Sequence, residues 1–245
     1  MSQLIIDIQD KSHQGGGLNQ QTIANFKLQI PSHQFVCLVG PSGCGKTTLL
    51  NMIAGLDQQY QGQILINQQP AAAAHIGYVF QNPRLLPWYN VRQNIEIVFP
   101  QTPPSELIDS LLESMQLLDA QHRHPQRLSL GMQRRVSIIR AFAISPKLLL
   151  MDEPFVSLDA PTARQIRQQL YKLWLSRPHT VLFVTHDLRE AIALADRLIF
   201  LSASPMRICA DIPVKLNHLQ RNDAKAIEDY RQHLLDQHGE LSKLL

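Results

Sequence analysis

A glycine-rich stretch that ends in a lysine and two threonines is the part of this sequence best suited to phosphate chemistry. Residues 40–48 fit the pattern G-x-x-x-x-G-K-S/T of a phosphate-binding loop. Its glycines let backbone N–H groups turn towards phosphate oxygens, Lys46 can place its charge on the β- and γ-phosphates, and the Thr47 hydroxyl can ligate Mg²⁺. We therefore expect a nucleotide site made by Gly40, Pro41, Ser42, Gly43, Cys44, Gly45, Lys46, Thr47 and Thr48.

The segments on either side of this loop have the character that such a loop requires. Residues 34–39 form a short apolar run with β-branched members, which predicts a buried strand, and residues 48–55 predict a helix that stops at Gly55. A glycine turn that only caps an ordinary helix could explain the motif alone. It would not explain a strand before it and a helix after it.

Further polar residues stand at the ends of other apolar runs: Gln81, Asp152, Glu153 and His186. Asp152 can help Thr47 to hold Mg²⁺, and Glu153 can orient or deprotonate the water that attacks the γ-phosphate. His186 can donate to a γ-phosphate oxygen, and Gln81 can reach the metal or the water. Taken alone, an acid pair can also be a simple strand-end cap, and a single histidine is more often a packed or surface residue.

The elements that must position these residues alternate between strands and helices. Strands are predicted at 4–8, 25–30, 63–66, 75–80, 148–151, 180–184 and 197–201. Helices are predicted at 91–98, 105–118, 128–143, 160–176 and 188–195. Buried strands that alternate with helices indicate a largely parallel sheet, and ligands of such sheets bind beyond the carboxyl ends of the strands.

The helix predicted at 128–143 opens with a second candidate anion site. Ser129 is a good N-cap, and a helix N-terminus that carries Ser129 and Gly131 can bind an anion. An ordinary capped helix explains the same residues equally well.

Composition excludes several classes of function. The 245-residue chain has a formal net charge of +3 with its basic residues scattered, which argues against a nucleic-acid partner. Cys37, Cys44 and Cys209 have no metal-ligand spacing, and so few cysteines suit a reducing cytosol. The N-terminus lacks the pattern of a signal peptide, and no apolar run approaches the roughly 18 residues that span a bilayer.

Six motifs resemble, in content and order, those of the nucleotide-binding subunit of ATP-binding-cassette (ABC) transporters: the loop 40–48, Gln81, residues 128–135, residues 148–153, residues 157–159 and His186. The resemblance covers roughly residues 4–215. Within the family, Met132 and the runs 152–155, 185–191 and 201–208 are similar to the nitrate, sulfonate and taurine importer group.

The resemblance implies an α/β fold with a P-loop NTPase core, a largely parallel sheet, an antiparallel β-subdomain and an inserted α-helical subdomain. The single ABC domain would span about residues 4–235. The core would take residues 1–80 and 146–210, the helical subdomain 81–145, and a short tail with one helical apolar stripe 211–245.

The resemblance also implies an ATPase that uses ATP and Mg²⁺ and works as a homodimer. Each ATP would lie between the loop of one subunit and Ser129 and Gly131 of the other, with residues 157–159 crossing the interface. Transmembrane permease subunits would be direct partners and an external solute-binding protein an indirect one. The protein would lie on the cytoplasmic face of the inner membrane, with residues 83–90 in the permease groove; a plain core loop is the alternative there.

Two departures from the family pattern concern the affinity for ATP. Leu130 stands where the family usually has the first glycine of Leu-Ser-Gly-Gly, and His13 stands where an aromatic residue usually stacks on adenine. Three other functions stay open: a soluble ABC-type ATPase of DNA repair or translation, an importer of a different solute, and a P-loop kinase. The soluble members resemble fused pairs or carry long coiled-coil inserts, and a kinase would not need residues 128–135.

Overall fold

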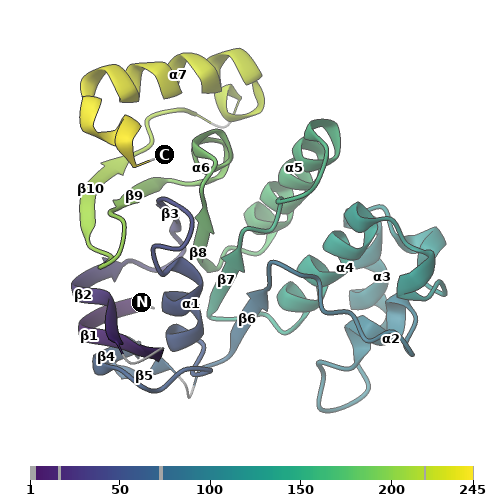
Figure 1. Cartoon of the computed structure of the whole chain (residues 1–245). Helices are drawn as coiled ribbons and strands as arrows, with labels where there is room; N and C mark the ends of the chain where they lie inside the picture. Colours follow the sequence, from purple (N-terminus) through teal and green to yellow (C-terminus); the bar gives the residue numbers. More distant parts are fainter. Residues whose placement is uncertain (1–3, 16–17, 72–73, 218, 245) are drawn as a thin grey trace. The chain divides into compact units, whose positions relative to one another are not determined.

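A computed structural model describes residues 4–15, 18–71, 74–217 and 219–244, without the side chains of residues 13–15, 18–20 and 243. The chain forms two compact units (Figure 1): Met1–Ala74 with Thr180–Leu245, and His75–His179. The boundaries predicted for the core, the helical subdomain and the tail differ from the boundaries of these two units, and that division stays a prediction. The expected glycine turn at residues 16–17 and the connector at 72–73 lie outside the described residues.

An antiparallel sheet opens the first unit, in the order β2 (Leu18–Ile30), β1 (Leu4–Gly15), β4 (Gln61–Ile66) and β5 (Gln69–Pro70). Leu4, Ile6 and Ile8 are buried and alternate with more exposed residues, as expected when one face of a strand meets the core. Strands β1 and β2 extend beyond the predicted ranges 4–8 and 25–30. They do so because residues at the polar end of β1 still pair with β2, as His13 does with Gln20.

A second sheet of the first unit joins β3 (Phe35–Val39), β8 (Thr180–Thr185), β9 (Arg197–Leu201) and β10 (Ile208–Pro213). Strand β3 runs parallel to β8 and β9, and β10 pairs with β9 in the antiparallel sense. Every residue of β3 is fully buried, which explains its unbroken apolar sequence. The sequence did not predict β10, which pairs with β9 but alternates half-buried and exposed residues.

The helices of the first unit are α1 (Lys46–Ile53), α6 (Leu188–Leu194) and α7 (Ala224–Gln237). Helix α7 lies beside α6 (Figure 1), and Arg189 on α6 donates to Glu228 on α7 at 2.6 Å. Ile227 and Leu234 of α7 are buried, so part of the apolar stripe predicted for the tail packs inside this unit.

The second unit contains the parallel strands β6 (Ile76–Val79) and β7 (Leu148–Asp152), together with α2 (Val91–Glu96), α3 (Ser105–Ser114), α4 (Leu130–Ala143) and α5 (Ala160–Ser176). Helix α4 packs on β6 so closely that a Cβ on Gly77 would lie 2.5 Å from the carbonyl oxygen of Ala141. Helix α3 ends earlier than predicted, because Gln116 adopts a positive φ of 54°. Within the described ranges of both units, no helix has the length and apolar character to cross a membrane.

Candidate active site

The predicted phosphate-binding loop lies between the end of β3 and the start of α1. Gly45 is the N-cap of α1 and has φ 108°, and Gly43 has φ 78°. A Cβ on Gly45 would lie 2.9 Å from Thr22 Cγ2, whereas a Cβ on Gly43 would meet no atom within 4 Å. Gly43 is therefore required by its backbone conformation alone, and Gly45 by both its conformation and the close approach of β2.

Lys46 places a positive charge inside this loop. Its side chain is only 5% exposed, and its Nζ donates to the carbonyl oxygens of Gly40 and Pro41 at 2.8 and 2.9 Å. The first turn of α1 contains no acidic residue, and no side chain caps its N-terminus. A buried ammonium beside an uncapped helix N-terminus, with the exposed Thr47 next to it, fits a nucleotide polyphosphate and its Mg²⁺.

His186 lies at the same sheet edge as the loop. Val39 at the end of β3 is opposite Thr185 at the end of β8, so the chain leaves both strands at this edge. The Thr185 hydroxyl donates to Glu190 Oε2 at 2.9 Å and accepts from the backbone N–H of Asp187 at 3.0 Å. These bonds fix the turn that carries the exposed His186. Glu190 is not among the residues predicted for the site; its signal in the sequence is a carboxylate five residues after Thr185, the hydroxyl residue that ends the strand.

Gln81, Asp152 and Glu153 stand at the same edge of the β6–β7 pair in the second unit. Val79 near the end of β6 is opposite Met151 of β7, so Gln81 follows one strand while the two acids end and follow the other. Asp152 is 3% exposed. Burial raises the pKa of the nearby Tyr78 hydroxyl, and the negative charge of Asp152 raises it further.

Glu153 has an unusual backbone conformation. Its φ of 41° is positive, which is uncommon for residues other than glycine and costs conformational energy. Its carbonyl oxygen accepts from the N–H of Val156 at 3.2 Å, so the residue lies in a tight turn directly after β7. The surrounding structure thus determines where the half-buried Glu153 side chain starts.

The predicted second anion site is the N-terminus of α4. The Ser129 hydroxyl caps this helix by accepting from the N–H of Met132 at 3.2 Å. The ordinary capped helix, which was the alternative explanation of these residues, is therefore present. Gly131 is buried, and a Cβ there would lie 2.8 Å from Thr162 Cγ2 on α5. Close helix packing therefore explains Gly131 independently of any anion. Leu130 is 40% exposed at this N-terminus.

The structure thus gathers the predicted residues in two groups: the loop 40–48 with His186 in the first unit, and Gln81, Asp152 and Glu153 in the second. His13 lies in β1 opposite Gln20, and its side chain is outside the described residues. The role predicted for each residue stays a prediction.

Comparison with known proteins decides the family. The profile described as ABC transporter matches residues 23–156, more than half of the chain. The chain belongs to the ABC transporter family. It is 36% identical over 236 residues to an aliphatic sulfonates import ATP-binding protein of Bacillus licheniformis, which covers 95% of this chain and 92% of that protein. It is 37% identical over 199 residues to a nitrate import ATP-binding protein of Synechococcus elongatus, covering 78% and 73% of the two chains.

Solved ABC structures agree with this assignment. A dimeric ATP-binding cassette in a post-hydrolysis state with ADP and Pi has a TM-score of 0.76 and 28% identity, covering 89% of this chain and 100% of that one. A second dimeric cassette, described as that of a bacterial ABC transporter, has a TM-score of 0.75 and 28% identity. The predicted family and α/β fold class are confirmed, and this ABC protein binds and hydrolyses ATP.

Proposed function

We propose that two copies of this ABC protein energise the import of a small anionic solute, such as a sulfonate, taurine or nitrate, through separate permease subunits. The observation that carries this proposal is the 36% identity to a sulfonate import protein over 95% of the chain. The nitrate import relative supports the same solute class, since nitrate is also a small anion. The protein would lie on the cytoplasmic face of the inner membrane, and an external solute-binding protein would deliver the solute to the permease.

In this proposal the predicted site residues act on one ATP. Lys46 binds the β- and γ-phosphates, and Thr47, Gln81 and Asp152 hold Mg²⁺, which neutralises phosphate charge when bound. Glu153 accepts a proton from the attacking water, and His186 donates to a γ-phosphate oxygen. The products are ADP and phosphate. Most of the rate enhancement would come from positioning and from charge stabilisation. The fixed turns around Glu153 and His186 are consistent with such positioning.

Each ATP would be shared between two chains. Ser129 and Gly131 at the N-terminus of α4 would face the phosphates held by the partner's loop, and residues 157–159 would cross the interface. The exposed Ser129 suits this role, because its hydroxyl and the helix N-terminus are open to a second molecule. The two structurally similar cassettes are dimeric, which supports this arrangement.

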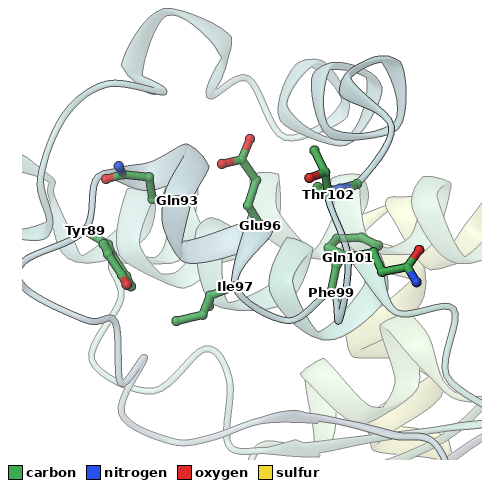
Figure 2. A pocket seen from close by; sticks show the side chains of 8 residues that line it. Tyr89, Gln93, Glu96, Ile97, Phe99, Gln101 and Thr102 are labelled. Carbon is green, nitrogen blue, oxygen red and sulfur yellow. The ribbon is translucent and has the colours of Figure 1, made fainter.

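A pocket on the second unit is suited to contact with a permease subunit. It has a volume of about 400 Å³, and Figure 2 shows side chains that line it around α2; the lining comprises Tyr89, Gln93, Glu96, Ile97, Phe99, Gln101, Thr102 and Pro103. Trp88 beside it is 67% exposed and Ile97 48% exposed. Exposed aromatic anchors next to a hollow are typical of protein interfaces. We assign this surface, Trp88 with the pocket, to a cytoplasmic helix of the permease.

Uptake in the source organism tests the proposal. The chromosomal gene is replaced by the Glu153→Gln allele, and the uptake of labelled taurine, ethanesulfonate, nitrate and a neutral sugar is compared with that of the parent. We expect loss of uptake of taurine, ethanesulfonate or nitrate and unchanged sugar uptake. Normal uptake of these three solutes, or selective loss of sugar uptake, would contradict the proposed solute class. Normal uptake of every solute together with a DNA-repair or translation defect would favour a soluble ATPase.

A further inference from the structure

The segment between β6 and α2, residues 80–90, is held in place by side chains rather than by a strand or helix. Arg134 donates from Nη1 to the carbonyl oxygen of Phe80 at 2.6 Å and from Nη2 to that of Gln81 at 2.5 Å. Arg140 donates from Nη2 to the carbonyl oxygen of Pro83 and from Nη1 to that of Arg84, both at 3.0 Å. Each guanidinium fork therefore binds two successive carbonyl groups.

The spacing of the two arginines matches the spacing of the carbonyls. Six residues separate Arg134 from Arg140 on α4, which corresponds to about 9 Å along a helix. Three residues separate Gln81 from Arg84; they can span at most about 10 Å, and the bend at residues 81–82 shortens that span. The segment can thus lie along α4 with both forks engaged. The Phe80 ring adds a contact, since the Arg84 guanidinium lies 4.0 Å from its centroid.

Burying the charged side chain of Arg134 at this position costs free energy. It is 1% exposed, and burial lowers its pKa to about 10, although the negative charge of Asp152 opposes the shift. Its guanidinium therefore stays charged at neutral pH. Its Nε lies buried without a hydrogen-bond partner among the residues that the structure describes. Because a buried and incompletely satisfied charge is a weak source of stability, packing alone is a poor explanation for it.

The far end of the segment is also held by side chains. Asn94, fully buried on α2, donates to the carbonyl oxygens of Leu86 and Tyr89 at 3.1 and 3.0 Å. Gln126 donates to the carbonyl oxygen of Pro87 at 3.1 Å. The same segment thus carries Gln81 at one end and the proposed permease surface at the other, with the two arginines of α4 between them.

We infer that Arg134 and Arg140 are positioning residues that fasten the Gln81 segment to α4, so that Gln81 and the Ser129 end of α4 move as one body. This inference rests on the proposed role of Gln81 in the ATP site. Neither arginine needs to touch ATP. Each acts by fixing the backbone from which the Gln81 side chain extends, and a displacement of about 1 Å at a catalytic group can lower a rate by up to 10²-fold.

A double-mutant cycle tests whether Arg134 acts through Gln81. ATP turnover is measured for Gln81→Ala, Arg134→Met and the double variant, with Arg134→Lys as a milder change that keeps the charge but loses the fork. We expect Arg134→Met to lower kcat by about 10- to 10²-fold with less than about a threefold change in KM for ATP. The double variant should be no slower than Gln81→Ala alone, because one residue acts through the other. Multiplicative effects of the two changes would overturn the inference.

Amide hydrogen exchange gives a readout that does not depend on activity. In Arg134→Met, and in Arg140→Met, the amides of residues 81, 82 and 84–86 should exchange at least about tenfold faster, while those of β7 stay unchanged. Arg135→Met is the matched control, because this α4 arginine donates to Gln165 at 2.9 Å instead of to the segment. Unchanged exchange in residues 81–86, or an equal increase in the Arg135→Met protein, would overturn the inference.

The two assays also separate this inference from the proposed role of Gln81. If Gln81→Ala retains full turnover, the proposed role of Gln81 is wrong, and hydrogen exchange still decides whether the arginines hold the segment. If Arg134→Met does not fold, Arg134→Lys takes its place in the cycle and in the exchange experiment, with the same expected directions and smaller effects.

Discussion

Alanine at Gly45 should damage the phosphate-binding loop by an amount that the structure allows to be worked out. With φ at 108°, an alanine there is strained by about 1–3 kcal/mol. Its Cβ would lie 2.9 Å from Thr22 Cγ2, and Thr22 is 9% exposed, so overpacking adds about 1–3 kcal/mol. If the native loop carries the whole cost, affinity for ATP falls by a factor of about 30 to 10⁴, since 1.4 kcal/mol corresponds to a factor of ten.

Two further variants separate strain from contact. Gly43→Ala has the strain of φ 78° but no atom within 4 Å of the new Cβ. Only the strain of about 1–3 kcal/mol then applies, so affinity should fall by a factor of about 5 to 10². Thr22→Ala removes Cγ2 and should restore about ten- to 10²-fold of affinity in the Gly45→Ala background.

The assay is the dissociation constant of a fluorescent ATP analogue, measured with thermal unfolding as a check on the fold. Equal losses in Gly45→Ala and Gly43→Ala, with no recovery on adding Thr22→Ala, would refute the argument that β2 limits the space behind this loop.

The remaining predictions concern hydrolysis, docking and thiol access. Glu153→Gln should retain ATP binding and lower steady-state phosphate release by about 10²-fold or more; near-normal release would remove Glu153 from its role. Trp88→Glu, at a 67% exposed position, should weaken recruitment to permease-containing membranes while hydrolysis without permease persists, and undiminished recruitment would exclude this surface. Maleimide should label exposed Cys209 quickly and Cys37 and Cys44 slowly, because both are buried and burial raises the pKa of the Cys37 thiol; three equally fast thiols by mass spectrometry would contradict this burial.

The elements that could be predicted from the sequence are those whose pattern follows burial. Strands β3, β7 and β8 are continuous apolar runs because they are buried on both faces. The polar half of β1 and the edge strand β10 were missed, because backbone pairing holds them and leaves little apolar signal. The early end of α3 depends on one positive φ at Gln116, where no glycine or proline marks the break.

The candidate site shows the same division. The loop 40–48 and the acids after β7 follow local patterns whose chemistry is visible in the residue types. The Arg134 fork was not visible, because its partners are backbone carbonyls about 50 residues away and any residue supplies a carbonyl. Gly131 was assigned to phosphate binding from its motif, and its close approach to Thr162 became apparent only from the packing of α4 on α5.

Whether two chains build each ATP site is tested by ATP binding to dimers of controlled composition, in which one chain carries Lys46→Ala and the other Ser129→Arg. Each altered homodimer should bind almost no fluorescent ATP analogue at its composite sites, because both sites carry a defect. A mixed dimer pairs the intact Lys46 of one chain with the intact Ser129 of the other, so we expect one restored site per dimer, about half of the wild-type stoichiometry. Hydrolysis is measured beside binding, since coupling between the sites can suppress turnover in a dimer with one intact site. Verified mixed dimers that recover neither binding nor hydrolysis would contradict the claim that two chains build each ATP site.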